Sequence, residues 1–238
     1  KVKFTELHNA GKRYAVVDAF NDTHLATLGE AAKSLKLVTG GSGLAAGIAK
    51  NWQPQLRAQS EAKRAGYPTQ AATVILSGSC SLMTNQQVAA YNTNAPHFAL
   101  DIDDCLNSDN YSKQVFDWVV SHLDAPLAPI VYATADVNAL QATHKKYGAQ
   151  VASQAVEQLF AELAIKLKEY GVRNFIVAGG ETSGVVTQSL QLDGFHIGPQ
   201  ISPGVPWVKA INSDICLALK SGNFGTVAFF SQAQEYFK

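Results

Sequence analysis

Residues 179–184 read Gly-Gly-Glu-Thr-Ser-Gly, a run of small and polar residues that could hold an anion. Paired glycines let a backbone approach a ligand closely and take dihedral angles that other residues resist. The hydroxyls of Thr182 and Ser183 could cap a helix or contact a phosphate oxygen. These residues predict a phosphate-binding turn, although a tight turn that binds nothing would have the same composition.

The elements on either side of this turn would aim it. The apolar run at residues 174–178 predicts a buried strand, and residues 185–190 predict the start of a helix. A strand that enters a helix through such a turn points several free backbone N–H groups at one place, which suits an anion.

Three other turns rich in glycine and serine stand between an apolar run and a predicted helix. They lie at residues 40–43, 77–81 and 221–225, after predicted strands at 37–39, 73–76 and 215–220. Ligands bind at the carboxyl edge of an open parallel sheet. We therefore expect the turns to share one edge and to form a trough lined by backbone amides.

Apolar strands alternate with amphipathic helices along the chain. This alternation predicts an α/β fold, a mostly parallel sheet with helices on both faces. The clearest helix spans residues 151–170, where the apolar residues form one stripe and Gly171 ends the helix. Residues 194–207 break the alternation and predict an antiparallel pair or a flap around Pro203 and Gly204.

The N-terminal part of the chain predicts two strand–helix units of its own. Residues 14–19, Tyr-Ala-Val-Val-Asp-Ala, predict a short strand, and the helix that follows would be capped by Asp22 or Thr23. The later part of residues 51–70 predicts a loop, which could separate these units from the rest. The chain starts at Lys1 without a methionine, which suggests a cut inside a longer protein.

Composition narrows the class of protein. The 238 residues contain 19 Lys and Arg against 19 Asp and Glu, so the chain lacks the basic face of a nucleic-acid binder. It has no apolar run of 18 residues and no signal-peptide pattern, so we expect no membrane partner. Cys80, Cys105 and Cys216 have no metal-binding spacing and are expected to be buried, reduced thiols in a cytoplasmic protein.

Two familiar nucleotide motifs fit poorly. No glycine turn ends in Lys-Ser or Lys-Thr, so the expected site is of a non-Walker type. Residues 40–47 come near a dinucleotide fingerprint, but a clear acidic partner on a strand about twenty residues further on is missing.

Several single residues leave alternatives open. Lys220 could contact a phosphate as a point charge or could lie in solvent at the end of its strand. Glu181 would repel a phosphate, yet it could hold Mg²⁺, bind a ribose hydroxyl or cap a helix. His97 and His196 are expected to lie beside the core rather than to act as ligands.

The carboxylates of Asp101, Asp103 and Asp104 follow a predicted strand and could hold Mg²⁺ on a loop. A solvated loop with a helix cap nearby is the favoured interpretation.

Four motifs together carry a resemblance to a known family. They lie at residues 77–81, 179–184, 203–207 and 219–225. In order and spacing, the set resembles the C-terminal nucleotide-binding domain of the four-carbon acid sugar kinase family, and the 3-oxotetronate kinases most of all. The similarity runs from about Tyr14 to the end of the chain.

The resemblance implies a function. Members of this family use ATP, with Mg²⁺, to phosphorylate four-carbon sugar acids at the terminal hydroxyl. On this sequence their ATP contacts fall at Ser77, Gly179, Gly180, Glu181, Thr182 and Gly222.

The family holds its sugar acid mainly through an N-terminal domain with an Asp-Asp-Phe-Thr-Gly motif, which this sequence lacks. Residues 1–238 would thus be the nucleotide-binding domain alone, inactive without its N-terminal part. The catalytic base, the metal ligands and the oligomeric state are not identified. A non-catalytic module that binds a nucleotide or sugar phosphate, and a dinucleotide-binding oxidoreductase domain, are the alternatives.

Overall fold

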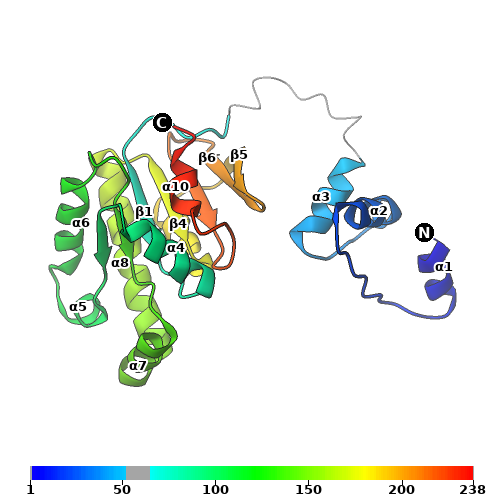
Figure 1. The fold of residues 1–238 in the computed structure, drawn as a ribbon, viewed down its shortest axis with the longest axis horizontal. Helices are drawn as coiled ribbons and strands as arrows, with labels where there is room; N and C mark the ends of the chain where they lie inside the picture. The colour runs from blue at the N-terminus through cyan, green and yellow to red at the C-terminus, as the bar shows by residue number, and fades with distance from the viewer. Residues whose placement is uncertain (1, 52–64, 238) are drawn as a thin grey trace. The chain divides into compact units, whose positions relative to one another are not determined.

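The computed structural model describes residues 2–51 and 65–237, and the chain divides into two compact units, Lys1–Gln59 and Ser60–Lys238. Figure 1 shows a small helical unit at the N-terminal end of the chain and a larger α/β unit. That residues 1–238 act as one nucleotide-binding domain stays a prediction. Along the described chain, no helix is both long enough and apolar enough to cross a membrane.

The described residues of the first unit form the helices α1 (Val2–Asn9), α2 (Asp22–Ala32) and α3 (Ser42–Lys50). Asn21, rather than the predicted Asp22 or Thr23, caps α2, because its side chain accepts the N–H of His24 at 2.9 Å. Helices α2 and α3 approach closely at two glycines, and a Cβ on Gly29 would overlap the backbone of Gly47.

Two predicted strands are missing from this unit. Residues 14–19 and 37–39 belong to no strand, so those two predictions are wrong for the structure of this chain. A strand exists only when its backbone pairs with a neighbour, and the described residues of the first unit contain no strand that could serve as one. The turn at residues 40–43 nevertheless opens a helix, with Gly41 at the N-cap of α3.

The second unit is built on a seven-stranded sheet in the order β2-β3-β1-β4-β7-β6-β5. Five neighbouring strands are parallel, while β6 and β5 run antiparallel at one end. The strands are β1 (Thr73–Ser77), β2 (His97–Ala99), β3 (Ile130–Tyr132), β4 (Asn174–Ala178), β5 (Phe195–Ser202), β6 (Val205–Ala210) and β7 (Cys216–Lys220). This is the mostly parallel sheet that the sequence predicts.

Helices cover both faces of the sheet (Figure 1). Alternate residues of a strand point to opposite faces, so Val74 and Leu76 of β1 enter one core and Ile75 enters the other. The first core is closed by α5, α6, α8 and α9, the second by α4 and α10. The helices of this unit are α4 (Leu82–Asn92), α5 (Ile102–Asn107), α6 (Tyr111–Ser121), α7 (Val137–Tyr147), α8 (Ala149–Tyr170), α9 (Gly180–Ser189) and α10 (Phe229–Gln234).

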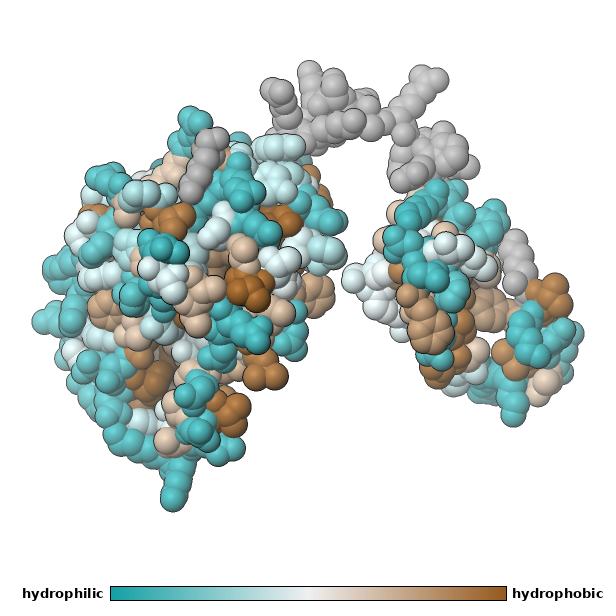
Figure 2. Space-filling view, viewed as in Figure 1, coloured by the Kyte–Doolittle hydropathy of each residue, from teal (hydrophilic) through white to brown (hydrophobic). Residues whose placement is uncertain are grey.

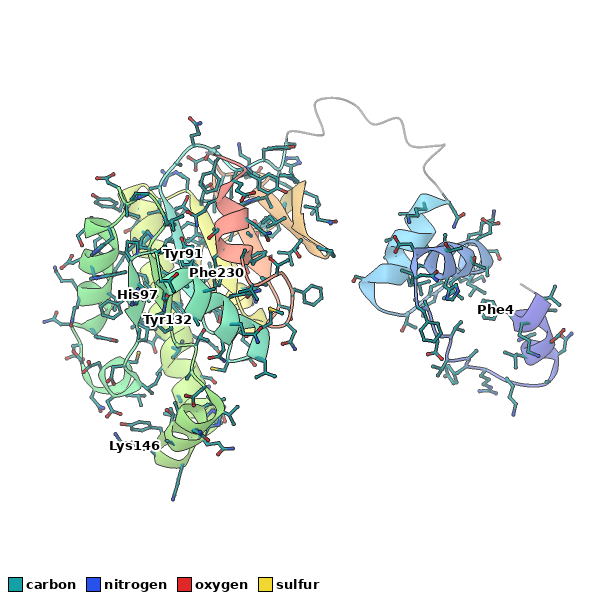
Figure 3. All side chains as sticks on the ribbon, viewed as in Figure 1. Phe4, Tyr91, His97, Tyr132, Lys146 and Phe230 are labelled. Carbon is teal, nitrogen blue, oxygen red and sulfur yellow. The ribbon has the colours of Figure 1, made fainter. Side chains whose placement is uncertain are left out.

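The C-terminal helix α10 is anchored in the second core. The rings of Tyr91 and Phe230 pack edge to face with their centroids 5.6 Å apart (Figure 3). Gln234 donates to the Tyr91 hydroxyl at 2.7 Å, and the Trp207 indole donates to the carbonyl of Ala233 at 2.9 Å. These polar atoms are buried and satisfied, which fixes the helix against the sheet.

Residues 195–210 form an antiparallel pair, which is one of the two arrangements that the sequence predicts. Strands β5 and β6 meet at a turn in which Gly204 has a φ of 79°, a conformation that suits glycine. The pairing is interrupted between Ile197 and Gln200 and again between Gln200 and Ser202. The long helix α8 also agrees with the sequence, and Gly171, at a φ of 124°, ends it.

Candidate functional site

Three of the predicted turns lie side by side at the carboxyl edge of the sheet. Strands β1, β4 and β7 are adjacent and parallel, and their last residues Ser77, Ala178 and Lys220 are in register. The carbonyl of Ala178 accepts the N–H groups of Gly78 and Ser79 at 3.0 and 3.2 Å. The predicted common edge is thus confirmed for these turns, whereas the turn at 40–43 lies in the first unit.

Glycines allow these turns to come close together. A Cβ on Gly78 would overlap the hydroxyl of Thr182, which belongs to the turn after β4. A Cβ on Gly222, from the turn after β7, would lie 2.7 Å from Ser79 Oγ and 2.9 Å from Ser81 Oγ. Hydroxyl groups from neighbouring turns therefore lie against the backbone of Gly78 and Gly222, where a larger residue would not fit.

The helices that follow β1 and β4 lie on opposite faces of the sheet. Strand β1 leads into α4, which packs in the second core, while β4 leads into α9, which packs in the first. Helices that leave neighbouring strands toward opposite faces open a crevice at the carboxyl edge, and open α/β sheets bind their ligands in such a crevice.

The N-terminus of α9 faces this edge. Its N-cap residue is Gly179, at a φ of 124°, and no described side chain caps the helix. Gly180 is exposed, and a Cβ on it would meet no atom within 4 Å. Glu181 is exposed in the first turn, whereas Thr182 is buried with an exposed fraction of 4%. An uncapped helix start of this kind favours an anion.

Lys220 lies beneath the turn after β7 and is fully buried. Its ammonium donates to Thr84 Oγ1 at 2.9 Å and to the carbonyl of Gly222 at 2.8 Å. Burial disfavours the charged form and lowers the pKa of Lys220 to about 8. The solvent-exposed alternative for this lysine is wrong, because its amine braces the turn from inside.

Thr84 is a site residue that the sequence did not single out. It is fully buried, accepts from Lys220 and donates to the carbonyl of Gly222 at 2.8 Å. It also lies 3.2 Å from Ser79 Oγ, so it joins the turns after β1 and β7. In the nearby sequence, only its position three residues after Ser81 could have pointed to Thr84, because the Ser81 hydroxyl accepts the N–H of Thr84 as a helix cap.

Ser77 is at the same edge, but its side chain points into the protein. It is fully buried, and its hydroxyl lies 2.7 Å from Thr134 Oγ1. This pairing ties the end of β1 to the segment after β3. The structure therefore gives Ser77 a positioning role, and its contact with ATP stays a prediction.

A hollow adjoins the turns after β1 and β4, with helices α5, α7 and α8 on its other sides. Glu157 of α8 and Glu181 both line it, beside apolar residues that include Leu140 and Val156. Burial, and then the charge of Glu181, raises the pKa of Glu157. Two carboxylates near one another can both contribute oxygen ligands to a divalent cation.

The other metal candidate has a structural role. The carboxylate of Asp101 caps α5 by accepting the N–H groups of Asp103 and Asp104, and Asp103 pairs with Lys146 at 2.6 Å. The helix cap of the favoured interpretation is confirmed, but Asp103 and Asp104 lie in α5 rather than on a solvated loop. Within residues 2–51 and 65–237, no group of three or more His, Cys, Asp or Glu side chains could hold a metal ion.

The remaining candidates lie away from the turns or are inert. His97 and His196 are both exposed, so the expectation that they lie beside the core is wrong. All three cysteines are free thiols, but only Cys216 is buried, while Cys80 and Cys105 are partly exposed. Burial raises the pKa of Cys105 to about 12, so it is not a reactive thiolate at neutral pH.

Known relatives extend beyond this chain. A protein from Actinobacillus succinogenes named 3-oxo-tetronate kinase is 55% identical over 237 residues, which is 100% of this chain and 56% of the relative. One of the same name from Haemophilus influenzae is 53% identical over 98% of this chain and 56% of its own length. The chain thus spans little more than half the length of these relatives.

Solved structures have the same fold. A crystal structure of a Salmonella typhimurium protein matches with a TM-score of 0.86 at 52% identity, over 100% of this chain and 56% of that one. Residues 74–230 match the family described as "Nucleotide-binding C-terminal domain", and this range contains all three neighbouring turns. The chain belongs to this family of nucleotide-binding C-terminal domains.

Proposed function

We propose that this chain is the ATP-binding part of a kinase that phosphorylates four-carbon sugar acids of the 3-oxotetronate type. The γ-phosphate of ATP would pass to the terminal hydroxyl of the acid. The observation that carries the proposal is the convergence of the turns at Gly78, Gly179 and Gly222 beside the uncapped start of α9. The names of the curated relatives support a kinase of the 3-oxo-tetronate type.

The triphosphate would be held mainly by backbone and hydroxyl groups. The N–H groups of Gly180, Glu181 and Thr182 lie in the first turn of α9, and a helix terminus contributes about 0.3–1 kcal/mol to anion binding. Micromolar to millimolar affinity needs only about 4–8 kcal/mol in total. Several turns, the charge of Lys220 and contacts to the adenine base can supply this binding free energy, although the chain has no net charge.

Mg²⁺ would be shared between the phosphates and the carboxylate of Glu181, with Glu157 nearby. Magnesium in kinases is bound through one or two carboxylates plus phosphate oxygens. Its charge would also offset the repulsion between Glu181 and the triphosphate. Phosphoryl transfer depends mostly on positioning and on charge stabilisation, and the residues of this edge provide both.

The sugar acid would be bound by the upstream part of a longer protein, so we expect the present chain to be inactive alone. We place the kinase in the cytoplasm. The dinucleotide alternative loses support from the structure, because the turn at 40–43 does not follow a strand.

Two glycines of α9 provide a matched test by calorimetry with ATP and Mg²⁺. Both Gly180 and Gly184 have open space where a Cβ would be, but only Gly180 lies in the first turn. Gly180→Val should weaken ATP binding at least tenfold, whereas Gly184→Val should change it less than threefold. Equal affinities for Gly180→Val and the unaltered chain would remove this turn from the site.

A kinase assay on the full-length protein with a panel of four-carbon sugar acids tests the reaction itself. Turnover of a 3-oxotetronate is the expected result. Tight ATP binding without turnover of any acid in the panel would instead favour a non-catalytic nucleotide-binding module.

A further inference from the structure

The first unit exposes several large apolar side chains. The exposed fractions of Tyr14, Val16, Phe20 and Leu37 are 92%, 98%, 84% and 83%. Figure 2 shows brown, hydrophobic side chains on the surface of this small unit. Among its described residues only Gly29, Ala32 and Gly47 are buried, so this described part of the unit has almost no core of its own.

The helices of this unit are nevertheless packed specifically. Gly29 and Gly47 let the backbones of α2 and α3 meet. Asn51 donates to the carbonyls of Gly47 at 2.9 Å and Ala26 at 3.3 Å, which joins the end of α3 to α2. A specifically packed pair of helices without paired strands is what we expect of a β-α-β-α unit whose strands have no sheet to join.

The segments before these helices have the composition of buried strands. Residues 14–17 and 37–39 read Tyr-Ala-Val-Val and Leu-Val-Thr, with apolar residues at consecutive positions. Consecutive apolar residues are typical of strands whose two faces are both covered, as in parallel sheets. The helix α2 lies between the segments, and a connection of that length links parallel strands.

The relatives indicate where such a sheet would come from. This chain corresponds to the C-terminal part of curated relatives and spans 56% of the length of two of them. The remaining part of those proteins precedes it. An upstream segment of that length is large enough to form a sheet of its own.

We propose that residues 14–19 and 37–39 are parallel strands of an upstream domain, and that α2 and α3 cover one face of its sheet. The first unit then belongs to that upstream domain, and the nucleotide-binding domain begins with the second unit. The turn at residues 40–43 would open at the carboxyl edge of the upstream sheet. The proposal does not depend on ATP binding, so the two can fail separately.

Hydrogen exchange, measured on the full-length protein and on the 238-residue chain, tests this directly. Amides of residues 14–19 and 37–39 should exchange at least 100-fold more slowly in the full-length protein. Amides of β1 and β4 should be protected in both and serve as the internal control. Equally fast exchange of residues 14–19 in both proteins would overturn the proposal. Protection in the short chain that rises with concentration would also overturn it, because a second copy would then be the partner.

A pair of charge substitutions gives an independent readout. Val16→Asp should lower the melting temperature of the full-length protein by roughly 5–10 °C, because it would bury an unpaired charge, and should leave the short chain unchanged. Leu82→Asp, at a residue of α4 that is 76% exposed, should shift neither protein. If Val16→Asp behaves like Leu82→Asp in the full-length protein, residue 16 is not in a sheet.

Discussion

The two units contain the same local pattern, an apolar run followed by a glycine-rich turn and a helix, but they use it differently. In the second unit the apolar runs are central strands, and β1 and β4 are buried at every position. In the first unit residues 14–19 are exposed and Val38 in the run 37–39 is half-buried, and neither run is paired in a sheet. The pattern therefore determines the helix and the turn locally, while the strand depends on neighbours from elsewhere in the chain.

The largest expected difference concerns aromatic residues in the two units. Phe175 of β4 is fully buried, whereas Phe20 is 84% exposed. Phe175→Ala should lower the free energy of unfolding by about 3–5 kcal/mol through lost burial and a cavity, and Phe20→Ala should change it by less than about 0.5 kcal/mol. Denaturant unfolding of the 238-residue chain measures both, and a cost above 1 kcal/mol for Phe20→Ala would show that the first unit has a core.

The glycine turns themselves provide the next comparison. A Cβ on Gly222 would press on Ser79 and Ser81, whereas a Cβ on Gly41 would meet nothing within 4 Å. Gly222→Ala should weaken ATP binding about tenfold, or roughly 1.4 kcal/mol, and Gly41→Ala should leave it unchanged. Calorimetric titration of each variant with ATP measures the affinities. A similar loss of affinity in both variants would mean that the turn at 40–43 also contacts the nucleotide.

The next prediction concerns Lys220, which is buried beneath the turn after β7. Because the pKa of Lys220 is about 8, below its ordinary value of 10.5, burial of the charged amine opposes folding below pH 8. This penalty is relieved as the pH rises from 8 toward 10.5, since the folded chain then releases a proton that the unfolded chain keeps. The same loss of charge should weaken ATP binding between pH 7 and 9.

Lys220→Met removes the charge and keeps an apolar stem of similar length. ATP affinity at pH 7 should fall about fivefold, and the decline in affinity between pH 7 and 9 should disappear. Affinities of the unaltered chain that do not vary over this range would exclude a contribution from the charge of Lys220.

The smallest expected effect is at Glu181. The first turn of α9 contains this acid, whereas the first turn of α3 contains none. Glu181→Gln should weaken the Mg²⁺ dependence of ATP binding about threefold and lower the pKa of Glu157 slightly, since burial is the main cause of its rise. Magnesium titrations and NMR detection of the Glu157 carboxyl check both effects. A stronger Mg²⁺ dependence in the variant would contradict the proposed metal contact.

Much of the second unit could be predicted from the sequence, because its strands and helices have clear periodicity and its turns stand at fixed places between them. The family resemblance, which the match of residues 74–230 confirms, rested on the same turns. The burial of Lys220 and its contact with Thr84 could not be predicted. The two residues are 136 positions apart, and only the register of β1, β4 and β7 brings them together.

The errors have a similar origin. Residues 14–19 and 37–39 have strand-like composition, but pairing is a property of the whole sheet rather than of the segment. The exposure of His97 and His196 follows from their places on β2 and β5, the outermost strands. The order of strands in a sheet cannot be predicted from the local periodicity of the sequence.

The irregular pairing of β5 should reduce association between copies of the chain at high concentration. An outermost strand offers free N–H and C=O groups to other molecules and can seed aggregation. Here Pro199 removes one donor, the shifted pairing on both sides of Gln200 bends the strand, and the backbone of Gly66 lies against Gly198. At the opposite border β2 is only three residues long. Both borders of the sheet are therefore poor templates for stacking copies of the chain into fibres.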